Sequence, residues 1–144
     1  MRCEDIMKRA LSWVLPDDNA HVAAKRMRDA GIGFLPVCDG TMKPLGALTD
    51  RDICVRVAAD DKRPSNVGVR EIMTLEVVTV NARADLEEAR KLMAERRKSR
   101  LICVNDQGKL VGVLSLSDLA EAAAGEAAET LREVAEREVH PPYA

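Results

Sequence analysis

The hydrophobic and polar positions of this chain follow one order twice. A short apolar run is followed by polar turn residues and then by apolar residues at spacings of three and four, which is typical of an amphipathic helix. These segments span residues 13–15 and 19–30 in the first half and residues 77–80 and 85–97 in the second. Asn19 and Asp85 stand where the N-caps of the two helices are expected. Each half therefore begins with a predicted strand and helix.

Two further apolar runs follow in each half, separated by turn-forming residues. They span residues 34–38 and 45–48 in the first half and residues 101–104 and 110–114 in the second. Asp39-Gly40 and the segment 105–108 favour hairpin-like loops, so the runs on either side should pair as antiparallel strands. A second helix is predicted to start near Asp50 and near Leu116. Each half is a β-α-β-β-α unit, which places the chain in the α/β class, with an α+β arrangement.

The two halves also share residue identities. At an offset of 66 they align without a gap from Ile6/Ile72 to Ala58/Ala124, with twelve identical pairs. Unrelated segments of this length would share about three at typical residue frequencies. The identical pairs are Ile6/Ile72, Met7/Met73, Val14/Val80, Ala23/Ala89, Lys25/Lys91, Met27/Met93, Leu35/Leu101, Lys43/Lys109, Gly46/Gly112, Leu48/Leu114, Asp52/Asp118 and Ala58/Ala124. The chain is therefore an internal duplication.

The duplication predicts the domain organisation. We expect repeat 1 at residues 1–59, a linker at 60–68, repeat 2 at 69–125 and a C-terminal helical extension and tail at 126–144. A unit of about 50 residues buries too little apolar surface to be stable alone, so the repeats should pack together through their sheets. A helical stripe runs from residue 117 to 139, with Gly125 as a weak point. This extended helix is interpreted either as a cap over the core or as a dimer contact.

Composition narrows the classes of function. Aromatic residues make up 2% of the chain and the net charge is −2, which counts against single-stranded nucleic-acid binding. No run reaches the roughly 20 apolar residues of a membrane helix, and the charged opening residues do not form a signal peptide. The four cysteines show no metal-binding spacing. We expect a cytoplasmic protein with reduced thiols, no metal site, and neither nucleic acid nor membrane as a partner.

The candidate chemistry lies where the second helix of each repeat begins. Residues 46–52 and 112–118 both fit Gly-x-x-Thr/Ser-x-x-Asp. The glycine permits close approach of another backbone, the hydroxyl can cap the helix, and the free amides of the first turn form an anion site. The aspartate can accept hydrogen bonds from the vicinal hydroxyls of a ribose. A capping box explains the same spacing without a ligand, but its recurrence in both repeats favours binding.

These features resemble a tandem pair of CBS domains, also called a Bateman module, and cover nearly the whole chain. The resemblance rests on the duplicated unit, the two motifs, the Leu35-Pro36-Val37 strand, and the openings Asp5-Ile6-Met7 and Glu71-Ile72-Met73. It resembles a stand-alone bacterial CBS-pair protein, and residues 112–118 are similar to the last repeat of the AMP-activated protein kinase gamma subunit. The resemblance implies repeats facing each other about a pseudo-twofold axis, with two clefts for AMP, ADP, ATP, NAD or S-adenosylmethionine. It also implies a homodimer.

The resemblance assigns roles to nine residues. Asp52 and Asp118 would hold the ribose hydroxyls, Thr49, Ser115 and Ser117 would contact ribose or phosphate, Ala47 and Val113 would line the adenine pockets, and Arg100 and Arg51 would meet phosphate. No cofactor is required beyond this adenosine-containing ligand. Pro36 against Ile102 and Arg51 against Ser117 make the two sites unequal.

The sequence thus predicts a non-catalytic regulatory module. An alternative is a scaffold with empty clefts that docks through its C-terminal helix. A nucleotide hydrolase is a further alternative, although no nucleophile-base pair or metal set accompanies Asp50 and Asp52.

Overall fold

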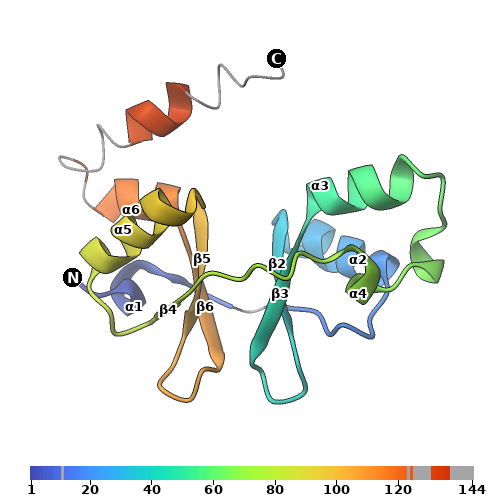
Figure 1. Ribbon diagram of the computed structural model, residues 1–144, viewed down its shortest axis with the longest axis horizontal. Coiled ribbons are helices and arrows are strands. Elements are labelled where there is room, and N and C mark those ends of the chain that lie inside the picture. Colours follow the sequence, from blue (N-terminus) through green and yellow to red (C-terminus); the bar gives the residue numbers. More distant parts are fainter. Residues whose placement is uncertain (11, 123, 125–130, 137–144) are drawn as a thin grey trace.

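A computed structural model shows two α/β units side by side, with their sheets facing each other across the centre of the molecule (Figure 1). The structure describes residues 1–10, 12–122, 124 and 131–136. In the first unit a helix, two strands and a helix follow in order: α2 (Ala20–Ala30), β2 (Phe34–Cys38), β3 (Pro44–Thr49) and α3 (Asp50–Ile53), which η1 (Cys54–Ala58) continues. The second unit has β4 (Thr79–Asn81), α5 (Leu86–Arg96), β5 (Arg100–Val104), β6 (Leu110–Ser115) and α6 (Leu116–Ala122). The predicted fold class is confirmed.

Local sequence accounts for the two long helices. The side chain of Asn19 accepts from the amide of Val22, and that of Asp85 accepts from the amide of Glu87, so both predicted N-caps are confirmed. The inward faces bury small or flexible side chains, with Ala23 and Met27 in the first unit and the equivalent Ala89 and Met93 in the second.

The two hairpins have the same register. β2 pairs antiparallel with β3, with Leu35 opposite Leu48, and β5 pairs antiparallel with β6, with Leu101 opposite Leu114. All four leucines are fully buried. The antiparallel pairing that the turn residues predict is therefore confirmed in both units.

The first strand is shorter in the first unit than the sequence predicts. Within residues 13–15 only Val14 makes a bridge, to Val37, whereas the equivalent part of the second unit forms β4, parallel to β5. The amide of Leu15 donates to the Asp18 carboxylate at 2.8 Å, and the next residue is Pro16, which has no amide to donate. The backbone therefore leaves the sheet after one residue.

The opening helix of each repeat packs on the other repeat. α1 (Cys3–Ile6) and β1 (Lys8–Arg9) join the second unit, where β1 pairs with β6 and completes the four-stranded sheet β1-β6-β5-β4. After the short turn η2 (Pro64–Asn66), α4 (Val69–Ile72) buries Val69 and Ile72 in the core of the first unit. The sequence did not predict this reciprocal exchange, which ties each repeat to its partner.

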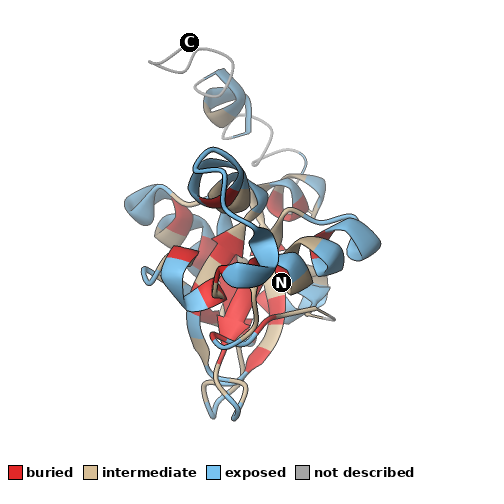
Figure 2. Cartoon of the chain, turned by 90° about the vertical axis from the view of Figure 1, so that its right-hand side faces the viewer, coloured by how far each residue is buried: buried red, intermediate tan, exposed pale blue. Residues whose placement is uncertain are grey.

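A third apolar cluster joins the two units. Its buried members come from facing strands: Cys38, Ile102 and Leu110. Half-buried side chains, including Trp13 and Phe34, pack against them. The burial view shows buried residues running through the strands between the helices (Figure 2). Packing through the sheet faces is therefore confirmed.

The C-terminal part is described only in segments. The described part of α6 runs to Ala122, and residues 124 and 131–136 are helical as well. The expected weak point at Gly125 and the predicted end of the helix at residue 139 lie outside the described residues. In the described part of the chain, no helix is long and apolar enough to cross a membrane.

Candidate functional site

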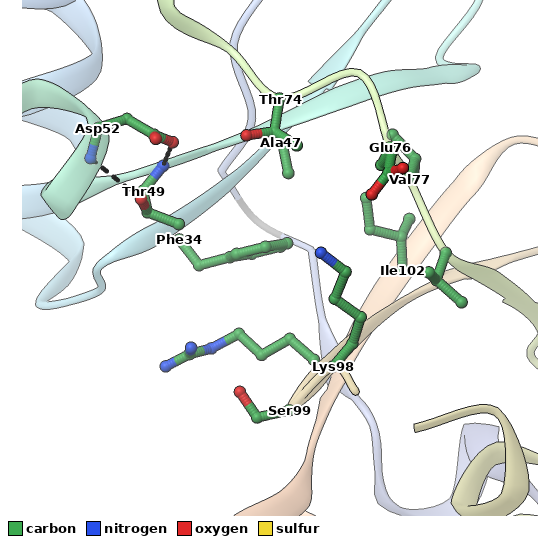
Figure 3. A pocket seen from close by; sticks show the side chains of 12 residues that line it. Phe34, Ala47, Thr49, Asp52, Thr74, Glu76, Val77, Lys98, Ser99 and Ile102 are labelled. Atoms are coloured by element: carbon green, nitrogen blue, oxygen red, sulfur yellow. Dashed lines mark hydrogen bonds between the residues drawn. The ribbon is translucent and has the colours of Figure 1, made fainter. Parts of the chain in front are cut away.

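The motif of the first repeat opens into a cleft whose far wall belongs to the second repeat (Figure 3). The cleft has a cavity volume of about 200 Å³ and is open to solvent. Ala47, Thr49 and Asp52 come from β3 and α3, and Arg100 from the start of β5. We call this space the first cleft; its full lining is Phe34, Ala47, Thr49, Asp52, Thr74, Glu76, Val77, Val78, Lys98, Ser99, Arg100 and Ile102. Four predicted site residues thus meet in one cavity.

The hydroxyl and the carboxylate of the motif form a reciprocal capping box. The amide of Thr49 donates to Asp52 Oδ2 at 2.9 Å, and the amide of Asp52 donates to Thr49 Oγ1 at 3.1 Å. The capping alternative is therefore confirmed as geometry. It leaves Asp52 Oδ1 without a hydrogen bond or ion pair among the described residues, so this oxygen can still accept from a ligand hydroxyl.

The prediction of an anion site on free amides at the start of α3 is wrong. The amide of Asp50 donates to the Gly33 carbonyl at 3.0 Å, and the amide of Arg51 donates to Asp50 Oδ1 at 2.8 Å. With the Asp52 amide held by Thr49, the first three donors of α3 are already used. A phosphate group at this cleft must therefore be bound by side chains.

The motif of the second repeat has the same capping box with a different outer partner. Ser115 and Asp118 exchange hydrogen bonds of 2.9 and 3.1 Å. Asp118 is only 7% exposed, and its Oδ1 lies 3.7 Å from Lys8 Nζ. Thr74 holds the position equivalent to Lys8, so in the first cleft the corresponding neighbour is uncharged.

Each motif glycine admits the backbone exchanged from the other repeat. Thr74 and Ala47 form two backbone hydrogen bonds of 2.9 Å beside Gly46, and a Cβ on Gly46 would lie 2.5 Å from the Thr74 carbonyl oxygen. A Cβ on Gly112 would lie 2.6 Å from Met7 Sδ and 2.8 Å from the Lys8 carbonyl oxygen. The expected close approach is confirmed, and the approaching neighbour is the exchanged segment.

The two repeats differ most where the strand after the long helix begins. The guanidinium of Arg100 lies 5.8 Å from the centre of the Phe34 ring, and these two residues are equivalent under the 66-residue offset. Lys98 is likewise equivalent to Ile32. The second repeat therefore contributes two cations to the first cleft, whereas the first repeat has apolar residues at the two equivalent sequence positions.

The remaining predicted residues lie elsewhere. Ser115 and Ser117 line another pocket together with Ser99, Arg100 and residues of the segment 131–136. Val113 is half-buried beside Lys8 of β1. Arg51 is exposed and is not among the residues that line the first cleft.

Most of the lining was not predicted from the sequence. Thr74, Glu76, Val77 and Val78 reach the first cleft because the segment after α4 crosses it on the way to β4. The local sequence pattern around them carries no signal for a role in binding. Lys98 lies in the one dense basic run of the chain, at residues 95–100, which was a usable signal.

The buried thiols play a packing role. Burial raises the pKa of Cys3 and Cys38 to about 11 and that of Cys103 to about 12, so all three are protonated at neutral pH. Cys54 is exposed. Among the described residues, no three His, Cys, Asp or Glu side chains gather in a way that could hold a metal ion.

Comparison with known proteins agrees with this geometry. The sequence profile of the CBS domain matches residues 3–59 and again residues 69–125, so the chain belongs to the CBS-domain family and carries a CBS pair. It is 39% identical over 118 residues to the CBS domain-containing protein YhcV of Bacillus subtilis, covering 81% of each chain. It is 33% identical over 115 residues to the uncharacterized protein MK0525 of Methanopyrus kandleri, covering 80% of this chain but 59% of that protein.

A solved structure shows the same fold. The CBS domain protein PAE2072 from Pyrobaculum aerophilum, complexed with AMP, superposes with a TM-score of 0.77 at 22% identity, covering 90% of this chain and 99% of that chain.

Proposed function

We propose that this chain is a regulatory sensor whose first cleft binds an adenosine-containing ligand. One observation carries the proposal: Thr49 and Asp52 of one repeat and Lys98 and Arg100 of the other line the same cavity. A ribose diol can donate to Asp52 Oδ1, a phosphate can pair with the two cations, and Val77 and Ile102 offer apolar surface to a base. The AMP complex of PAE2072 supports this ligand class.

The cleft also gives a means of regulation. Because its walls come from both repeats, a ligand that contacts both stabilises one relative placement of the units. Such a ligand acts on a partner only if it binds two placements with different affinity. We propose that the chain works as a homodimer in the cytoplasm and without catalysis. Its regulatory effect on a partner then depends on the relative placement of the two units.

Isothermal titration calorimetry with AMP, ATP, NAD and S-adenosylmethionine tests the proposal. At least one should bind more tightly than about 1 mM, which corresponds to about −4 kcal/mol. Asp52→Ala should weaken that binding about 10- to 100-fold, because a hydrogen bond to a charged group contributes about 1.5–3 kcal/mol. Asp118→Ala is the matched control, since it removes the equivalent carboxylate outside the first cleft.

Two results would contradict the proposal. One is the absence of binding by all four compounds while a partner protein docks through the C-terminal segment, which would favour the scaffold. The other is equal affinity in wild type and Asp52→Ala, which would leave the carboxylate with its capping role alone. Chromatography of ATP and NAD after incubation with the protein tests the hydrolase alternative.

A further inference from the structure

The connection between the long helix and the next strand has opposite character in the two repeats. Residues 97–100 read Arg-Lys-Ser-Arg, whereas the equivalent residues 31–34 read Gly-Ile-Gly-Phe. Both follow a helix of 11 residues and lead into a strand that starts the same hairpin. The structural context is shared, so the three cations of the second repeat are not required by the fold.

The first residue of this connection has an unusual backbone in the second repeat. Gly31 ends α2 with φ 65° and ψ 35°, and Arg97 ends α5 with φ 54° and ψ 44°. Glycine adopts this left-handed conformation freely, but a residue with a Cβ is strained there. The second repeat thus keeps an arginine at a position where the first repeat has the residue that fits best.

Packing does not explain Arg97. Met42 also has a left-handed backbone, with φ 69°, and the equivalent residue of the second repeat is Gly108. Met42, however, packs against the apolar cluster between the sheets. Asp61, at φ 53°, is of a residue type that tolerates this conformation. Arg97 is exposed, and its side chain takes part in none of the hydrogen bonds or ion pairs found among the described residues. Strain without a packing gain is a signal of function.

The charges around the first cleft indicate what Arg97 could bind. Lys98 and Arg100 line the cleft and form no ion pair with a carboxylate in the described part of the chain. Two acidic residues, Asp52 and Glu76, line it as well, and Glu76 lies beside Val77, across the cleft from Asp52 (Figure 3). The lining alone is therefore balanced in charge. Arg97, directly before Lys98, adds the positive charge that a longer phosphate chain needs.

We propose that Arg97 is a specificity-determining residue that makes the first cleft prefer a nucleoside polyphosphate to the monophosphate. This inference rests on the proposed adenosine-ligand function of the same cleft. With the ribose at Asp52, the α-phosphate would meet Arg100 and Lys98, and the phosphates beyond it would reach Arg97, which directly precedes Lys98 in the chain. The strained arginine is retained because its charge is used there.

The test compares AMP, ADP and ATP by titration calorimetry in magnesium-free buffer at fixed ionic strength. Wild type should bind ATP about tenfold more tightly than AMP, and Arg97→Gly should bring that ratio below about threefold, mostly through weaker ATP binding. The urea midpoint of Arg97→Gly should be equal to or above that of wild type, because glycine relieves the strain. Arg96→Ala, which removes a neighbouring exposed cation at the end of α5, should leave the ratio unchanged.

The outcomes separate this inference from the proposed function. If AMP binds but the AMP-to-ATP ratio is near one in wild type, or is the same in Arg97→Gly, the inference fails and the proposed function stands. If Arg96→Ala lowers the ratio as much as Arg97→Gly, general electrostatic attraction replaces a specific role and the inference also fails. If none of the three nucleotides binds, this inference fails, and the proposed function stands only if NAD or S-adenosylmethionine binds.

Discussion

The two motifs of this chain have almost the same internal geometry and very different surroundings. In each, a hydroxyl and a carboxylate three residues apart close a capping box, with hydrogen bonds of 2.9 and 3.1 Å. Asp52 shares its cleft with Thr74 and two cations from the opposite repeat, whereas Asp118 pairs with Lys8. The residues equivalent in sequence to the two cations are Ile32 and Phe34. The comparison teaches that the two repeats share the local support of the motif, while the residues that the opposite repeat brings to each motif differ.

The largest expected effect concerns the glycines that admit the exchanged backbone. Gly46→Ala should lower the free energy of unfolding by about 2–3 kcal/mol, because its Cβ would meet a backbone carbonyl oxygen at 2.5 Å that cannot move independently. Gly112→Ala should cost less, about 1–2 kcal/mol, because its nearest obstacle is the flexible Met7 side chain and the backbone carbonyl oxygen of Lys8 lies farther away, at 2.8 Å. Urea denaturation followed by circular dichroism measures both. A larger loss for Gly112→Ala would reverse this order.

The next effect concerns the cations of the second repeat that line the first cleft. Arg100→Ala should weaken AMP binding about tenfold, or about 1.4 kcal/mol, because a charge-assisted contact to phosphate is lost. Binding of adenosine, which has no phosphate, should change little. Calorimetric titration of both compounds checks this split, with Arg51→Ala as the control because Arg51 lies outside the lining of the first cleft. Equal losses for AMP and adenosine would show that Arg100 acts through its packing on Phe34.

The smallest effect concerns the neighbour of each carboxylate. Thr74→Lys copies Lys8 into the first cleft, where an ammonium would compete with a ligand for Asp52 Oδ1. An exposed ion pair contributes about 0.2–1 kcal/mol, so AMP affinity should fall by up to about fivefold. Lys8→Thr removes the pair with Asp118 and should leave AMP binding at the first cleft unchanged. Titration of the two variants measures the difference, and an unaltered affinity in Thr74→Lys would mean that the ligand does not use that oxygen.

The sequence predicted the architecture because each unit is defined by local signals. The N-caps Asn19 and Asp85, the helical spacing of apolar residues and the turns between strands act over a few residues, and all are confirmed. The strand at residues 13–15 was the exception. Its apolar pattern was right, but Pro16 and the diversion of the Leu15 amide to Asp18 ended pairing after Val14.

The site was predictable in part. Ala47, Thr49 and Asp52 meet in one cleft because they lie at fixed offsets along one strand-to-helix junction. Arg100 joins them because the second repeat faces the first across this cleft. The amide anion site failed because Gly33 and the Asp50 side chain compete for the same donors, a contact that spacing does not reveal.

By itself, the sequence determined the duplicated α/β unit, the face-to-face pairing of its sheets and the capping boxes, because these follow from periodicity, repeat offset and short-range hydrogen bonding. Only the tertiary structure decided that α1 and α4 change places between the repeats, that the segment 74–78 lines the first cleft, and that Lys8 pairs with Asp118. Those features depend on contacts between residues that are far apart in the chain. The whole fold decides which unit buries a short helix and which carboxylate a single charge meets, and the neighbouring residues in the sequence do not.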